Sequence, residues 1–147
     1  MIAPTAAVIG ASAGGIDALI TLFRNLPKNF NLPLVVVQHI APTTEVNPPV
    51  IFGPYFNGKV LEARDKMPIE KGHVYFAPPD YHLLVERDFT LALSQEDEVN
   101  YSRPSVDVLF ESAARAFGPS LCGVLLTGAN NDGACGLEVI QKAGGYT

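Results

Sequence analysis

The sequence has no tryptophan, only two cysteines, and no apolar run that approaches the ~20 residues of a membrane-spanning helix. Its first residues, 1–4, lack the basic start and the apolar core of a secretory signal peptide. We therefore expect no membrane insertion. Because Cys122 and Cys135 lack the C-x-x-C spacing of metal or redox motifs, we expect free core thiols, without a disulfide, in a reducing cytoplasm.

Basic residues are also scarce. Lys and Arg number 10 against 15 Asp and Glu, the formal net charge is −5, and no basic cluster occurs. Because contacts to phosphates need clustered Lys and Arg, this pattern argues against nucleic-acid binding. Hydrophobic residues make up 48% of the 147 residues and charged ones 17%, which predicts one globular domain over residues 6–147.

Apolar runs, glycine-rich corners and helical patterns alternate along the chain. Strands are predicted at 6–9, 34–37 and 121–126, with apolar runs that suit burial on both faces of a sheet. Amphipathic helices are predicted at 16–26 and 134–143. Strands that alternate with helices are typical of α/β proteins, so we expect a doubly wound, mostly parallel sheet in three layers.

The middle of the chain has a different character. Prolines interrupt residues 41–58, where only a short turn at 50–56 is expected, and 59–63 favours a short strand. Short β-type runs separated by turn residues over 73–93 predict a small antiparallel meander at one edge of the sheet.

A further helix is predicted after the polar loop at 95–103. Ser102 or Ser105 suits its N-cap, and Pro104 suits its first turn. Apolar residues recur at helical spacing on one face over 106–113, which indicates packing against the sheet.

Three reactive side chains, Ser12, His39 and Asp132, each follow one of the three buried strands. The ligand crevice of an open parallel sheet lies outside the carboxyl ends of its strands, so we expect these side chains to converge. His39 can take the proton of the Ser12 hydroxyl, and Asp132 can orient the imidazole and stabilise its protonated form. The pattern therefore predicts a nucleophilic serine hydrolase.

Each of these residues also has an ordinary structural explanation. Ser12 can cap the helix that follows it, His39 can simply end a strand, and Asp132 suits an N-cap or a turn. Their conjunction at three strand ends favours the catalytic interpretation. Residues 10–14 match G-x-S-x-G, but the chain order Ser, His, Asp differs from the Ser, acid, His order of α/β-hydrolases.

Phosphate and metal sites are disfavoured. The chain has no G-x-G-x-x-G motif and no P-loop lysine, and Gln38 precedes His39 where a dinucleotide site would have an acidic residue. His39, His73 and His82 share no short metal-ligand spacing. We expect neither a cofactor nor a metal.

Five motifs extend over nearly the whole chain: VIGASAGG at 8–15, VVQH at 36–39, YFAPPDYHL at 75–83, RPSVDVLF at 103–110 and LLTGANNDGA at 125–134. Jointly and in this order they resemble the catalytic domain of the CheB family of chemotaxis protein-glutamate methylesterases. The resemblance implies a Ser-His-Asp hydrolase that removes methyl groups, as methanol, from glutamyl esters on the cytoplasmic domain of methylated chemoreceptors. Some members of the family also deamidate glutamine.

The resemblance implies a role for each site residue and a cytoplasmic location. Ser12 becomes the nucleophile, His39 the base and Asp132 the orienting acid, with oxyanion contacts near Ala13 and Ala129. The family often has Thr and Met at these last two positions. The chain ends where the family continues with a further strand and helix, and no receiver domain precedes it, so we expect a truncated catalytic domain.

Two alternatives belong to other functional classes. A domain of the same fold can serve as a non-catalytic signalling module that docks receptors, in which case Ser12→Ala leaves partner binding intact. A hydrolase of small esters would turn over such esters but not a methylated receptor.

Overall fold

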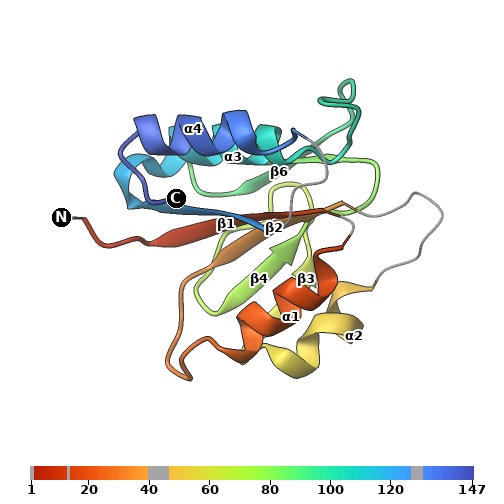
Figure 1. The fold of residues 1–147 in the computed structure, drawn as a ribbon, viewed down its shortest axis with the longest axis vertical. Coiled ribbons are helices and arrows are strands. Elements are labelled where there is room, and N and C mark those ends of the chain that lie inside the picture. Colours follow the sequence, from red (N-terminus) through yellow and green to blue (C-terminus); the bar gives the residue numbers. More distant parts are fainter. Residues whose placement is uncertain (1, 13, 40–46, 127–130) are drawn as a thin grey trace.

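A computed structural model describes residues 2–12, 14–39, 47–126 and 131–147, and its centre is a five-stranded parallel sheet (Figure 1). The strand order is β3-β4-β2-β1-β7. The strands of this sheet are β1 (Ala6–Ala11), β2 (Leu34–Gln38), β3 (Lys59–Glu62), β4 (His73–Phe76) and β7 (Leu121–Leu126). The helices are α1 (Ile16–Arg24), α2 (Pro48–Phe52), α3 (Val106–Phe117) and α4 (Ala134–Lys142).

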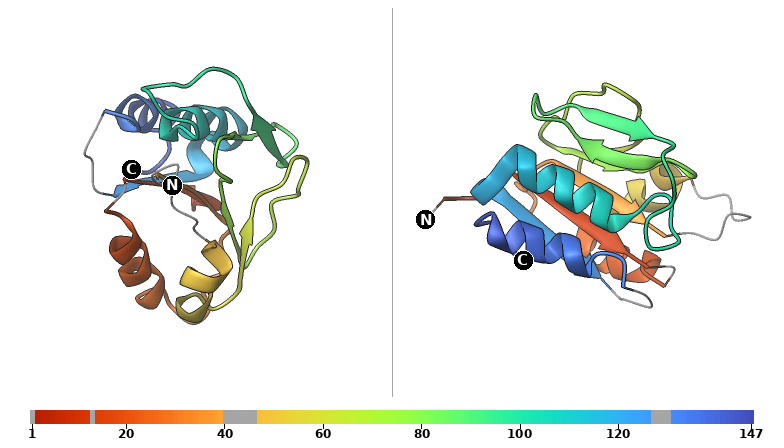
Figure 2. Two further views of the ribbon diagram at one scale, coloured as in Figure 1. Left: turned by 90° about the vertical axis from the view of Figure 1, so that its right-hand side faces the viewer. Right: turned by 90° about the horizontal axis from the view of Figure 1, so that it is seen from above.

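Helices cover both faces of the sheet. Figures 1 and 2 show α1 and α2 on one face and α3 with α4 on the other. Strand β1 shows why both faces need cover, because successive side chains point to opposite faces. Ala6 and Val8 belong to the core cluster that includes Leu109 and Phe110 of α3. Ile9 belongs to the other cluster. The expected doubly wound, three-layer architecture is confirmed.

A second, two-stranded antiparallel sheet consists of β5 (His82–Val85) and β6 (Leu91–Ser94), which packs on the α3 side of the molecule. These are two of the three strands of the predicted meander. The prediction is wrong for the first, because β4 pairs in parallel with both β2 and β3 inside the main sheet. Tyr75 and Phe76 are 1% and 2% exposed there. A short apolar run indicates that a strand is buried, but it does not indicate which strands pair with it.

The start of α3 differs from the expectation. Ser105 is the N-cap residue, but its hydroxyl makes no capping hydrogen bond to this helix, and Pro104 lies before the cap, after a cis peptide bond. The proline-rich segment contains the short helix α2 and a 3-10 turn at Gly53–Tyr55. Cys122 is partly buried and Cys135 is exposed in the first turn of α4, so the expectation of a core thiol is wrong for Cys135.

Candidate active site

The three central strands end at the same level of the sheet. Ala11 of β1 is the Cα partner of Gln38 at the end of β2 and of Leu126 at the end of β7. Ser12 and His39 are the next residues in their segments, and Asp132 follows β7 after residues that lie outside the described ranges. The predicted common edge is therefore present, because parallel strands in register deliver their following residues to one side.

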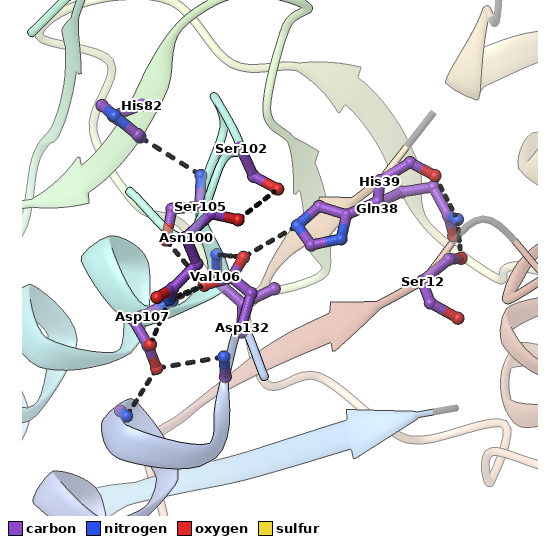
Figure 3. Close-up of polar contacts among 12 residues, drawn as sticks. Ser12, Gln38, His39, His82, Asn100, Ser102, Ser105, Val106, Asp107 and Asp132 are labelled. Carbon is purple, nitrogen blue, oxygen red and sulfur yellow. Dashed lines mark hydrogen bonds and ion pairs between the residues drawn. The ribbon is translucent and has the colours of Figure 1, made fainter. Parts of the chain in front are cut away.

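His39 and Asp132 are in direct contact. Nε2 of His39 lies 2.8 Å from Oδ2 of Asp132, and the two side chains are 15% and 0% exposed (Figure 3). An ionised carboxylate can only accept hydrogen bonds, so Nε2 carries the proton in this contact. In the neutral ring, Nδ1 is then the nitrogen with a free lone pair. A general base needs such a lone pair to accept a proton.

Asp132 accepts hydrogen bonds from several donors besides His39. Oδ1 accepts from Ser105 Oγ at 2.7 Å and from the Asp107 N–H at 3.1 Å. Oδ2 accepts from the Val106 N–H at 2.6 Å. Burial by itself raises the pKa of Asp132, but the hydrogen bond from His39, followed by those from Asp107, Ser105 and Val106, lowers the pKa to about 2. The carboxylate is therefore ionised at neutral pH. It accepts the hydrogen bond from Nε2 of His39 and so orients the ring.

The N-terminus of α3 reaches this site because Gly10 has no side chain. A Cβ at position 10 of β1 would overlap the Cγ atoms of Val106. Val106 is the first residue of α3 and 1% exposed. Its N–H is one of the donors at a helix N-terminus that have no partner within the helix. It donates a hydrogen bond to Oδ2 of Asp132. The helix dipole further favours the negative charge at this place.

A second buried carboxylate, Asp107, lies next to Asp132. Oδ1 of Asp107 accepts from the N–H groups of Gly133 and Gly136 at 3.0 and 2.6 Å, at the start of α4. Nδ2 of Asn100 donates to both acids, to Asp107 Oδ2 at 2.7 Å and to Asp132 Oδ1 at 3.1 Å (Figure 3). The amide thus bridges the two carboxylates and shields each from the other.

The loop between β6 and α3, which carries Asn100, is tied to its surroundings. The Ser105 N–H donates to Nδ1 of the buried His82, and Nε2 of that ring bonds to Asp97 O at 2.9 Å. The guanidinium of Arg103 bonds to Asp80 at 2.6 Å and reaches two backbone carbonyls of the loop. These contacts hold Asn100 against the acids.

Sequence reasoning missed Asn100 and Asp107 and misread Ser105. Residues 95–103 looked like a polar surface loop, and nothing local to Asn100 marks it as a partner of a residue 32 positions away. Asp107 has the position of an ordinary first-turn acid of its own helix, yet its carboxylate caps α4. The Ser105 hydroxyl donates a hydrogen bond to Oδ1 of Asp132 and does not cap α3. One signal was available, since two acids that each begin a helix after a strand suit mutual capping.

Ser12 lies at the same edge of the sheet as His39, and Figure 3 shows its hydroxyl directed away from the imidazole ring. Gln38 links the two residues through the backbone, because its Nε2 donates to the carbonyl oxygens of both. Ala13 and Ala129, expected near the oxyanion, lie outside the described residues.

Two other kinds of feature are absent from the described part of the chain. Over those ranges, no group of three or more His, Cys, Asp or Glu side chains is arranged to hold a metal ion. None of the helices in the same ranges is long and apolar enough to cross a membrane.

Comparisons with known proteins agree on one family. The profile of the family described as CheB methylesterase matches residues 7–147. A relative from Leptospira interrogans is 49% identical over 140 residues, which cover 95% of this chain and 72% of that protein. Protein-glutamate methylesterase/protein-glutamine glutaminase 2 of Anaeromyxobacter dehalogenans is 45% identical, with 95% of this chain and 41% of the relative covered. The crystal structure of the Thermotoga maritima CheB methylesterase catalytic domain superimposes with a TM-score of 0.84 at 33% identity, covering 98% of this chain and 78% of that one.

Proposed function

Because the chain belongs to the CheB methylesterase family, a family of hydrolases, we propose that it is a protein-glutamate methylesterase. Its substrates are glutamyl methyl esters on the cytoplasmic domain of chemoreceptors, and its products are glutamate and methanol. Ser12 is the nucleophile, His39 the general base and Asp132 the acid that orients His39. The protein acts in the cytoplasm, where its substrate lies.

The reaction has two steps with an acyl-enzyme between them. Nδ1 of His39 accepts the proton as Ser12 Oγ attacks the ester carbonyl, and Asp132 stabilises the imidazolium. The imidazolium returns that proton to the departing methoxide, which leaves as methanol, and a glutamyl ester of Ser12 remains. Water then attacks this ester with His39 again as base, which releases glutamate and restores the serine. The N–H groups of Ala13 and Ala129 are the proposed oxyanion donors.

The observation that carries the proposal is the 2.8 Å contact between His39 Nε2 and Asp132 Oδ2 at the strand ends that also bear Ser12. Asp132 is held by a set of donors that keep it ionised, which is the state that a base-orienting acid needs. The same constellation suits glutamine deamidation, with ammonia as the leaving group in place of methanol, and the names of relatives combine both activities.

The direct test measures methanol release from a methylated chemoreceptor, with the wild-type protein beside Ser12→Ala and His39→Ala. We expect release by the wild type and its loss, by at least ~10³-fold, in each variant. If the folded wild-type protein binds the receptor but releases no methanol, the result would favour the docking module. Turnover of a small ester without release from the receptor would favour the small-ester hydrolase.

A further inference from the structure

The last residue of β2, Gln38, has a polar side chain that is not needed for the sheet. Gln38 is 5% exposed, and its backbone is paired with Ala11 at the end of the β1–β2 ladder. One further ladder bond, from the His39 N–H to Ala11 O at 2.8 Å, closes the pairing. The proposed nucleophile follows Ala11 on one segment, and the proposed base follows Gln38 on the other.

The side-chain amide of Gln38 links the segment of Ser12 to the segment of His39. Nε2 donates to the carbonyl oxygen of Ser12 and, at 3.1 Å, to that of His39 (Figure 3). The orientation of the amide follows from its partners, because the flipped amide would place Oε1 against two carbonyl oxygens. Oε1 has no hydrogen-bond partner among the described residues.

The carbonyl oxygen of Ser12 is held from two sides. It also accepts the Gly15 N–H at 2.8 Å, at the start of α1. A Cβ on residue 15 would lie 2.9 Å from this oxygen and 3.3 Å from Gln38 Oε1, so glycine is what lets the helix start so close. Two donors on one oxygen restrict the orientation of the Ser12 carbonyl group.

We propose that Gln38 is a positioning residue for the hydrolytic reaction, and that its amide sets the distance and orientation between the segments of Ser12 and His39. The proposal rests on the proposed function, because it assumes that these two residues are the nucleophile and the base. Gln38 does not touch the substrate. It acts through the two backbone carbonyls, and a small misplacement of either reacting group costs rate and not binding.

The first test compares Gln38→Met with the matched control Gln141→Met, which changes an exposed glutamine of α4. Methionine keeps the length of the side chain and cannot donate to the carbonyls. We expect kcat for methanol release to fall ~10–100-fold in Gln38→Met, with KM within ~2-fold and with Tm lowered only by the loss of the two hydrogen bonds to the carbonyls. The control should match the wild type in all three. A kcat of Gln38→Met within ~2-fold of wild type would overturn the proposal.

A second variant, Gln38→Glu, provides a readout that a merely structural role does not move. When protonated, the carboxyl group introduced at this position donates one hydrogen bond, whereas the ionised carboxylate donates none and lies against two carbonyl oxygens. The rate of the variant divided by that of wild type should therefore fall as pH rises, by up to ~10-fold per pH unit. Taking the ratio removes any pH dependence that the two proteins share. A ratio that does not vary with pH contradicts the proposal.

A receptor-independent probe separates this inference from the proposed function. A fluorophosphonate reacts with an activated serine through attack of Oγ on phosphorus with loss of fluoride. Labelling of wild-type Ser12, lost in Ser12→Ala and slowed ~10–100-fold in Gln38→Met, supports both. If wild type and Gln38→Met are labelled at equal rates, only the proposed role of Gln38 is refuted, and the serine mechanism stands. No labelling of a folded wild type refutes the serine mechanism itself.

Discussion

Asp107 and Asp132 cap each other's helices. Asp132, just before α4, accepts the first N–H groups of α3, and Asp107, in the first turn of α3, accepts two N–H groups at the start of α4. Neither helix has a side-chain cap from its own N-cap residue. The exchange couples the position of Asp132, the proposed catalytic acid, to the packing of α3 against α4, because neither carboxylate can move without releasing donors of the other helix.

Removal of Asp107 should affect both stability and catalysis. Asp107→Ala leaves two buried N–H groups of α4 without acceptors, and we expect the free energy of unfolding to fall by about 1–3 kcal/mol. We also expect kcat to fall ~10-fold or more as Asp132 shifts. Urea unfolding and methanol release measure the two effects. Glu138→Ala, an exposed acid of α4, is the control and should change unfolding by no more than about 0.5 kcal/mol. A fully active Asp107→Ala protein would show that the coupling is dispensable.

Acid should destabilise the fold through Asp132. Its pKa is lowered from the usual 3.8 to about 2 in the folded protein, so the folded state binds its proton more weakly than the unfolded chain does. The resulting stabilisation, about 2 kcal/mol, is fully present above about pH 5 and is lost as pH falls through the interval from about 4 to about 2. Tm measured against pH should therefore drop less steeply over this interval in Asp132→Asn than in wild type. Parallel curves would contradict the assignment.

The Asn100 bridge should be sensitive to charge. Asn100 has a φ of 54°, which glycine tolerates, so Asn100→Gly removes the amide without new backbone strain. Asn100→Asp instead brings a third carboxylate beside Asp107 and Asp132. We expect Asn100→Asp to lose more activity at pH 8 than Asn100→Gly, and to recover part of it at pH 6, because like charges favour protonation of one acid.

The control for this pair is Tyr101→Gly, since Tyr101 is 99% exposed with a φ of 61° in the same turn. It tests whether the turn itself tolerates glycine. Equal activity of Asn100→Asp and Asn100→Gly at both pH values would refute the electrostatic role of the bridge.

Gly10 should be coupled to Val106. Gly10→Ala places a methyl group against the Val106 side chain, and we expect a loss of about 1–3 kcal/mol together with reduced kcat, since α3 carries the donors of Asp132. Val106→Ala removes the overlapping atoms. In a double-mutant cycle by urea unfolding, the two losses should therefore be less than additive by at least about 1 kcal/mol. Additive losses would mean that α3 accommodates the methyl group in another way.

The arrangement of the candidate site was partly predictable because it depends on local patterns. Three buried strands are each followed by a reactive side chain, and the carboxyl ends of parallel strands share one edge, so Ser12, His39 and Asp132 are placed at that edge without knowledge of the strand order. The contact between His39 and Asp132 agrees with that reasoning. The remaining roles at this edge stay predictions, those of Ala13 and Ala129 among them.

The sequence by itself determined where the main buried strands and helices form, that the sheet is mostly parallel, and which three side chains follow its central strands. Only the tertiary structure decided that β4 enters the main sheet, that Asn100 joins two carboxylates, and that Asp107 and Asp132 exchange helix caps. The physical reason is the range of the interactions. Periodicity reports burial one segment at a time, whereas a buried donor or acceptor takes the partner that folding brings within about 3 Å, however distant in sequence.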